Sequence, residues 1–163
     1  MELRGERVLL RRAEDGDVDA LLTLLSEPEI AQWWSAYEAD EVRADLGASF
    51  VILVGGVVVG WLQYDEETEP AYPHVAFDIL VTTRLRGRGY GREALRLAIR
   101  HFIARGHHRF TIDPSLGNER AIRAYAAIGF KPVGVLRAYE RAPDGSWRDG
   151  LLMDLLADEL VEG

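Results

Sequence analysis

At 163 residues the chain fits one domain with a substantial core, and the absence of cysteine excludes disulfides and a thiol nucleophile. The N-terminus lacks the apolar core of a signal peptide, and the longest apolar run, residues 50–62, is too short to span a bilayer. The net charge of −8 and the lack of a basic–aromatic platform disfavour a nucleic-acid partner, so we expect a cytoplasmic protein that binds neither membranes nor nucleic acids.

The first half of the chain reads as short elements separated by glycine, proline and acidic turns. Apolar residues three and four apart predict helices, and runs rich in β-branched residues predict strands. Gly55 and Gly56 suit a two-residue primed turn between two strands. In chain order we expect a strand over residues 7–12, helices over 17–25, from Pro28 and over 40–46, strands over 50–54 and 57–64, an acidic loop over 65–73, and a mostly apolar strand over 75–81.

The second half alternates two longer helices with strands. Gly106 ends the first helix, and Asn118 and Gly129 cap the two ends of the second. In chain order we expect a helix over 91–105, a strand over 108–113, a helix over 118–128, and strands over 133–139 and 147–155 around a turn at 143–145. The whole order predicts a single α/β (α+β) domain over 1–163, with a mixed central sheet of about six to seven strands flanked by helices on both faces.

Charge is distributed unevenly along the chain. Residues 1–83 hold 17 acidic and 5 basic side chains, whereas residues 84–163 hold 10 acidic and 14 basic ones. An acidic first half beside a basic segment suits an anionic cofactor that meets a cationic acceptor. The alternative is a basic helix face turned to solvent, since Arg92, Arg96 and Arg100 are four residues apart, but this leaves the arginines of the preceding turn unexplained.

A glycine-rich segment, Arg86–Gly91, separates the strand over 75–81 from the helix over 91–105. Glycines let the backbone turn sharply and approach a ligand closely, and the N–H groups at a helix start favour a phosphate. Surface turns before helices are also glycine-rich for structural reasons, so this segment alone leaves both explanations open. A Walker loop is excluded because it ends in Gly-Lys-Ser/Thr, whereas Gly91 is followed by Arg92-Glu93. A dinucleotide fingerprint that starts at Gly87 is excluded because its sixth position needs glycine or alanine and is Arg92 here.

A second motif surrounds the helix over 118–128. Asn118 at the helix start can cap the helix and can also offer its amide to a ligand. Tyr125 shares a helical face with Ala121 and Ile122 and points inward, which is typical of a core tyrosine whose hydroxyl finds a partner. The residues alone therefore leave a ligand role for Asn118 and a chemical role for Tyr125 open beside the structural ones.

Two aspartates occupy unusual positions in strands. Asp78 interrupts an otherwise apolar strand, and a buried carboxylate is costly unless it has a partner or a role. An outward-facing Asp78 is the alternative, although Ala76 and Leu80 on its face are apolar. Asp113 ends the next strand, where α/β sheets place ligand sites, but Asp113-Pro114 is also a common turn opener.

The two motifs together resemble those of a known family. Arg86–Gly91 fits Arg-x-x-Gly-x-Gly, and residues 118–130 fit Asn-x-x-Ala-x-x-x-Tyr-x-x-x-Gly-Phe, one helix and one strand later. Both patterns, in this order, resemble the GCN5-related N-acetyltransferases (GNAT), which bind acetyl-coenzyme A (acetyl-CoA). The resemblance implies a pyrophosphate site on 86–91, a pantetheine arm along 79–81, and Tyr125 as the general acid that protonates the departing thiolate. The cofactor-binding residues that it implies are Ile79, Leu80, Val81, Arg86, Gly87, Arg88, Gly89, Tyr90, Gly91, Asn118 and Tyr125.

The resemblance narrows to the aminoglycoside 6′-N-acetyltransferases. That family reads Thr-Asp-Pro-Ser-x-x-Asn before its last central helix, and residues 111–118 match it with Ile112 inserted. It also has a Trp-Trp pair near the N-terminus, an acidic loop and an aspartate in the following strand, as this chain has at 33–34, 66–70 and Asp78. Carboxylates and aromatic walls suit a polycationic sugar, because cations are attracted to both. The acceptor-binding residues implied are Trp33, Trp34, Tyr37, Glu66, Glu67, Asp78 and Asp113.

The reaction implied by this resemblance is direct attack of an amine on the thioester carbonyl in a ternary complex. We assign catalytic roles to Asp78, Asp113 and Tyr125. Asp78 is the first candidate base, and Asp113 either holds the acceptor's ammonium groups or shares the role of base. We expect a cationic small-molecule acceptor, no metal because the histidines lack zinc spacing, and a monomer or homodimer. The alternatives are a protein N-terminus or a siderophore precursor as acceptor, and a non-catalytic acetyl-CoA sensor.

Overall fold

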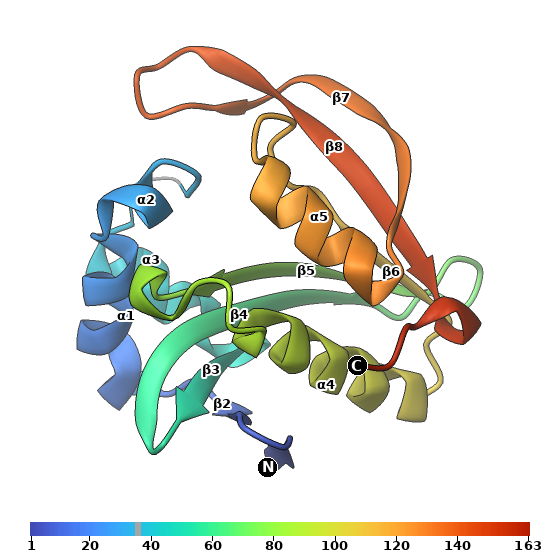
Figure 1. Cartoon of the computed structure of the whole chain (residues 1–163), viewed down its shortest axis with the longest axis horizontal. Coiled ribbons are helices and arrows are strands. Elements are labelled where there is room, and N and C mark those ends of the chain that lie inside the picture. The colour runs from blue at the N-terminus through green and yellow to red at the C-terminus, as the bar shows by residue number, and fades with distance from the viewer. Residues whose placement is uncertain (35–36) are drawn as a thin grey trace.

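A computed structural model describes residues 1–34 and 37–163 of the chain. Its centre is an eight-stranded sheet in the order β1-β2-β3-β4-β5-β6-β8-β7 (Figure 1). β5 and β6 are parallel and the other neighbouring strands are antiparallel, so the sheet is mixed, as predicted. The strands are β1 (Glu2–Arg4), β2 (Leu9–Arg12), β3 (Ser49–Val54), β4 (Val57–Glu67), β5 (His74–Val81), β6 (Arg109–Ile112), β7 (Lys131–Arg141) and β8 (Trp147–Leu156).

Helices cover both faces of this sheet, which confirms the predicted fold class. On one face α4 and α5 pack over the larger core, which includes Phe50, Phe102 and Phe110. On the other face α1 and α3 pack over a second core around Trp61. Within the residues described, none of the helices has the length and apolar character that crossing a membrane requires. The helices are α1 (Val18–Leu25), α2 (Pro28–Ala31), α3 (Ala39–Asp45), α4 (Tyr90–Ala104) and α5 (Glu119–Ile128).

The structure adds one strand and lengthens another. β1 pairs with β2 over three residues, too few for an alternating pattern to be read from the sequence, so the prediction of six to seven strands is one short. β4 continues to Glu67, which pairs with His74 of β5. Asp65, Glu66 and Glu67 therefore belong to a strand, and the expected acidic loop is shortened to residues 68–73.

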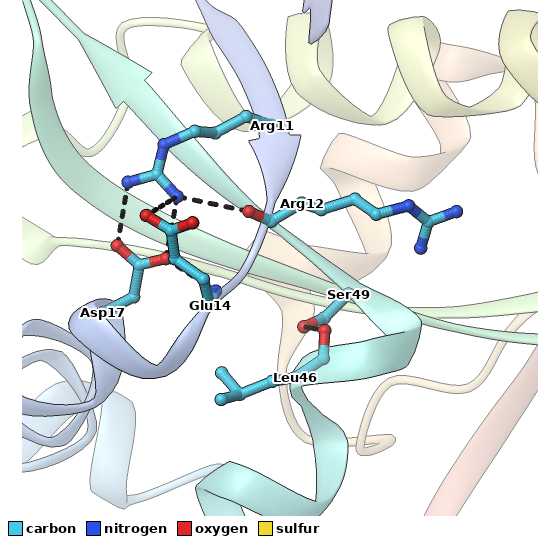
Figure 2. Close-up of polar contacts among 6 residues, drawn as sticks. All are labelled: Arg11, Arg12, Glu14, Asp17, Leu46 and Ser49. Carbon is cyan, nitrogen blue, oxygen red and sulfur yellow. Dashed lines mark hydrogen bonds and ion pairs between the residues drawn. The ribbon is translucent and has the colours of Figure 1, made fainter. Parts of the chain in front are cut away.

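A paired arginine and aspartate fasten α1 to β2 (Figure 2). Arg11 donates from Nη1 and Nη2 to the two carboxylate oxygens of Asp17, both at 2.8 Å. Asp17 is 4% exposed and also accepts the backbone N–H of Glu14. The Arg11 hydrogen bonds lower the pKa of Asp17, as expected of a bidentate pair. Ser49, at the start of β3, donates to Leu46 O at 3.1 Å, which fixes the turn between α3 and the sheet.

The sheet opens at its centre, because β5 continues beyond the end of β6. The two strands pair only over Val75–Phe77 and Phe110–Ile112. Pro114, just after β6, lacks the N–H group that would continue the ladder. Residues 78–81 of β5 thus have β4 on one side and an open edge on the other among the described strands. In Figure 1, α5 lies between β5 and the β7–β8 hairpin. This opening is at the carboxyl ends of β5 and β6, where α/β sheets place ligands.

Candidate active site

The larger of two adjoining hollows, about 740 Å³, extends from the open edge of β5 to the glycine-rich segment and α5. All but one of the residues expected to bind the cofactor line it; Arg88 is exposed and does not. Those that line it are Ile79, Leu80, Val81, Arg86, Gly87, Gly89, Tyr90, Gly91, Asn118 and Tyr125. The larger hollow is also lined by Arg92, Arg120 and Arg123, which were not predicted because a basic helix face is equally typical of a solvated surface.

The glycine-rich segment has the backbone conformation that an anion site requires. Gly87 and Gly89 have φ values of 81° and 82°, in the left-handed region that glycine tolerates. Gly89 precedes α4, a helix of 15 residues whose first N–H groups have no partner within the helix. The helix dipole and Arg86, at the same end of the larger hollow, favour negative charge there.

Arg7 fixes this segment from the β2 side. Its Nη1 donates to Arg88 O at 2.7 Å, its Nε donates to Glu93 Oε1 at 3.0 Å, and its guanidinium lies 4.7 Å from the centre of the Tyr90 ring. Glu93 Oε2 accepts the backbone N–H groups of Arg7 and Val8 at 2.7 and 2.9 Å. The start of α4 is therefore held by residues about eighty positions earlier, which sequence spacing cannot reveal.

Two glutamates at the start of α2 contact the chain that follows β5. Glu27 accepts from Thr82 Oγ1 at 2.8 Å and from the N–H and Oγ1 of Thr83 at 2.8 and 2.7 Å. Glu29 lines the larger hollow and pairs with Arg86. The first turn of α2 is thus attached to the glycine-rich side of the opening.

The smaller hollow, about 280 Å³, adjoins the larger one and is lined by carboxylates. Asp78 comes from β5, Asp113 from the turn after β6 and Glu140 from β7; among the described lining residues there is no lysine or arginine. Of the residues expected to bind the acceptor, Trp33, Trp34, Tyr37, Asp78 and Asp113 line this hollow. The lining residues that were not predicted from the sequence include Gln63, Ser115, Tyr139 and Glu140.

The surroundings of Asp78 raise the pKa of its carboxyl. Desolvation of its carboxyl, followed by the charges of Asp113 and Glu140, raises the pKa of Asp78 to about 7, although the residue is exposed to solvent through the open hollow. Burial also raises the pKa of Asp113, against the effect of a hydrogen bond from Tyr139. A carboxyl with a pKa near 7 can take a proton from a bound ammonium group in neutral solution.

Tyr139 reaches the smaller hollow through an irregularity in β7. The register with β8 shifts just before Glu140, and Ala138 has a φ of 47°, which is uncommon for a residue with a side chain. The Tyr139 ring lies over Gly150, where an added Cβ would come within 2.9 Å of it. Its hydroxyl donates to Asp113, which raises the pKa of Tyr139 to about 12.

Tyr125 and Asn118 line both hollows. Burial, together with the charges of Asp78 and Asp113, raises the pKa of Tyr125, so its hydroxyl keeps its proton at neutral pH. The Asn118 side chain accepts the N–H of Ala121 at 3.3 Å, which confirms the predicted cap of α5. Tyr125 is therefore a buried side chain and Asn118 a helix cap, and both also lie at the junction of the two hollows.

Glu66 and Glu67 require a correction, because the structure does not place them at the smaller hollow. Gln63 is opposite Asp78 and shares its face; Glu66, three residues further along β4, therefore points to the other face. There it contacts His107 Nε2 at 2.7 Å and Arg105 Nη2 at 3.3 Å. Glu67 ends β4 and lines neither hollow. The continuation of β4 carries both side chains away from the opening.

Trp33 and Trp34 lie near Tyr37 as expected, but the two tryptophans pack against different neighbours. Both tryptophans line both hollows. Trp34 is also packed between Tyr37 and Trp61, with ring centres 6.2 Å from each, and so belongs in part to the second core. Trp33 has the guanidinium of Arg148 5.1 Å from its ring centre.

Comparison with known proteins gives a consistent result. A model of the acetyltransferase (GNAT) family matches residues 18–130. Over 166 residues, the chain is 24% identical to an aminoglycoside N(6′)-acetyltransferase type 1 of Klebsiella pneumoniae, covering 86% of this chain and 80% of that protein. Over 79 residues it is 27% identical to a [ribosomal protein bS18]-alanine N-acetyltransferase of Haemophilus ducreyi, covering 48% of this chain and 54% of the relative.

A solved structure is similar over almost the whole chain. RimJ of Mycobacterium smegmatis, in complex with CoA-disulfide, has a TM-score of 0.81 and 26% identity. The match covers 96% of this chain and 85% of RimJ.

Proposed function

This chain belongs to the acetyltransferase (GNAT) family, and from that premise we propose that it acetylates an amino group of a polycationic aminoglycoside, with the 6′-amino group as first candidate. The coarser assignment, an acetyl-CoA-dependent N-acetyltransferase, follows from the family. The acceptor is inferred from the smaller hollow and from the likeness to the Klebsiella enzyme.

The residues of the larger hollow fit acetyl-CoA. Gly87 and Gly89 expose backbone N–H groups through their positive φ values, and Arg92 and Arg123 add positive charge suited to phosphates. The open edge of β5 at residues 79–81 offers backbone groups to an extended amide-bearing arm. We therefore assign the donor to this hollow.

One observation supports the acceptor most directly: the smaller hollow has three carboxylates and, among its described lining residues, no basic side chain. Such a site binds ammonium groups and would repel carboxylates and phosphates. Trp33 and Tyr37 add flat aromatic surface, which attracts cations and packs against sugar rings. Glu140 is already paired with Arg148, so Asp78 and Asp113 are the carboxylates left for the acceptor, and a neutral acceptor would bring no cation to them.

Acetyl-CoA, when bound, supplies the acetyl thioester. Asp78 accepts a proton from the acceptor's ammonium group, because its pKa is raised to about 7. Asp113 pairs with a neighbouring ammonium group and orients the acceptor. Tyr125 Oη, at the junction of the hollows, gives a proton to the departing sulfur, because a thiolate is poorly stabilised there.

A protein N-terminus is the second candidate acceptor. The likeness to RimJ and to the bS18-alanine acetyltransferase favours it. A peptide presents a single α-amino group, which can pair with only one of Asp78 and Asp113, the two carboxylates of the hollow that Arg148 does not neutralise. The charge of the site therefore favours the aminosugar.

The test is thiol release from acetyl-CoA with kanamycin, tobramycin, a linear polyamine and a panel of N-terminal peptides. The proposal expects turnover on the aminoglycosides with the highest kcat/KM. Turnover on peptides alone would overturn the acceptor assignment and leave the family and donor intact. Binding of acetyl-CoA without turnover on any amine would indicate a sensor.

A further inference from the structure

Arg148, on β8, joins two segments that are far apart in the sequence. Its Nη1 donates to Gln32 O at 2.7 Å and its Nη2 donates to Trp33 O at 3.1 Å, just after α2. Its Nε donates to Glu140 Oε1 at 2.8 Å across the β7–β8 hairpin. With the Trp33 ring beneath it, this one guanidinium contacts both sides of the smaller hollow.

α2 is anchored at its first turn, by Glu27 and Glu29, whereas Arg148 binds the backbone that follows this helix. α2 is only four residues long, and a helix of that length has almost no stability of its own. The tip of the β7–β8 hairpin extends from the sheet on the same side of the molecule as α2 (Figure 1). Trp33 and Glu140 come from these two segments and both line the smaller hollow, whereas Arg148 lines neither hollow.

The contacts of Glu140 show that its orientation is specified. Besides the Arg148 Nε–H, the Glu140 Oε1 atom accepts the Ser115 hydroxyl, and Ser115 is buried in the turn after β6. The Arg148 side chain is 20% exposed, so its hydrogen bonds are partly shielded from water. The planar guanidinium group of an arginine can donate hydrogen bonds to two carbonyls and a carboxylate at once. The ammonium group of a lysine cannot do so with the same geometry.

We propose that Arg148 is a positioning residue for the acceptor, fixing Trp33 and Glu140 at the separation that the bound amine requires. The inference rests on the proposed function in one respect, since it takes the smaller hollow as the acceptor site. It does not depend on which amine is bound there.

Positioning and simple charge make opposite predictions for the loss of Arg148. Arg148 is a positive charge beside an acidic hollow, so an effect through charge alone would make Arg148→Met bind a cation more tightly. Positioning predicts weaker binding, because Trp33 and Glu140 lose their common partner. Arg148→Lys keeps the charge and loses the fork, so under positioning it lies between wild type and Arg148→Met.

The experiment measures acceptor KM, kcat and acetyl-CoA Kd for wild type, Arg148→Met and Arg148→Lys, with the best amine that the wild type accepts. We expect acceptor KM to rise about tenfold for Met and about threefold for Lys, with acetyl-CoA Kd changed by less than about twofold. Arg141→Met is the matched control. Arg141 is a neighbour on the same hairpin whose guanidinium stacks on Trp147 and whose Nη1 donates to Gly145 O, so we expect wild-type values.

Hydrogen exchange of the ligand-free protein gives a readout that needs no acceptor. We expect faster exchange in peptides covering residues 30–34 of Arg148→Met, with unchanged exchange in α5. Unchanged exchange at 30–34, or an acceptor KM equal to or below that of wild type, would overturn the inference. Lack of wild-type turnover on aminoglycosides would instead count against the proposed acceptor, and the exchange result would still decide the role of Arg148.

Discussion

The two hollows adjoin one another but are built in different ways. Most of the larger hollow comes from two continuous stretches, residues 79–92 and 117–128, and its expected phosphate site is largely backbone. The smaller hollow takes single side chains from the chain around α2 and from β4, β5, the turn after β6, α5 and β7. A backbone site is preserved by the fold itself, whereas separate side chains can change one at a time. Proteins with this fold can therefore keep one donor and differ in acceptor.

The two hollows also differ in the sign of the charges that line them. Four arginines and two glutamates line the larger hollow, whereas the smaller one has three carboxylates and no basic side chain among its described lining residues. An anionic donor is thus repelled from the acceptor side, and a cationic acceptor is drawn to it. Tyr125 and Asn118 lie where these opposite fields meet. Substitutions on each side should accordingly change the binding of one substrate without changing that of the other.

The largest effect is expected at the junction, from Tyr125→Phe. Loss of the hydroxyl removes the proton donor, so kcat should fall about 100- to 1,000-fold, while the KM values for both substrates change by less than about twofold. Steady-state kinetics at saturating concentrations measure this. Tyr72→Phe, at an exposed loop position, is the control. An unchanged kcat for Tyr125→Phe would exclude it as the acid.

Asp78 makes the acceptor side sensitive to pH. Because its pKa is raised to about 7, kcat/KM for the acceptor should rise with pH through about 7, as the carboxylate forms in the free enzyme. Asp78→Asn should remove this rise and lower kcat/KM at pH 8 by about 100-fold. Asp65 lies on β4 and lines neither hollow, so Asp65→Asn is the control and should keep the rise of kcat/KM with pH. A rise that persists in Asp78→Asn would assign it to another group of this coupled cluster.

The same pKa has a consequence for stability. An aspartate has a pKa of about 3.9 in the unfolded chain, and the folded value is higher, so the folded state binds this proton more tightly. The contribution of Asp78 is therefore fully present below about pH 4 and is lost as the pH rises towards 7 and above. Denaturant unfolding of Asp78→Asn between these pH values should show a smaller loss of stability than wild type. The functional group is thus held in the fold at a cost.

Asp113→Asn separates binding from chemistry on the acceptor side. Its carboxylate is expected to pair with an ammonium group, so the substitution should raise acceptor KM about 30-fold or more and leave acetyl-CoA Kd unchanged. Asparagine keeps an oxygen that can accept from Tyr139, so the local structure should persist. Asp158→Asn, which lines neither hollow, is the control. Normal binding of both substrates to Asp113→Asn would contradict its assignment.

The sequence predicted the larger hollow better because its signals are local. A glycine that needs a positive φ, a cap at Asn118 and an apolar strand are each specified by a few neighbouring residues. The hairpin turn at Gly55 and Gly56 was also predicted from a local signal. Both glycines have positive φ values, 57° and 79°, as a primed turn requires. Such features are independent of the register between distant strands.

The smaller hollow was only partly predictable, because it depends on register and strand length. Tyr139 faces Asp113 only because β7 is irregular at Ala138, and no residue type there signals the irregularity. Glu66 was misplaced because β4 is three residues longer than its alternating pattern indicates. Arg148 reaches Trp33 across 115 residues of chain. These are tertiary facts that one sequence does not encode locally.

The smallest expected effect is on acetyl-CoA binding, and it is a gain in affinity, whereas the substitutions on the acceptor side cause losses. Glu29 is a carboxylate in the larger hollow that pairs with Arg86, a residue expected to face the pyrophosphate. Bound phosphate must compete with this pair, so Glu29→Gln, which keeps the shape and removes the charge, should bind acetyl-CoA about threefold more tightly, as suits a partly exposed ion pair. Acceptor KM should stay unchanged. Equilibrium titration at low salt measures this, and Asp19→Asn, which lines neither hollow, controls for net charge. Weaker binding in Glu29→Gln would mean that Glu29 holds Arg86 in place for the phosphate instead of competing with it.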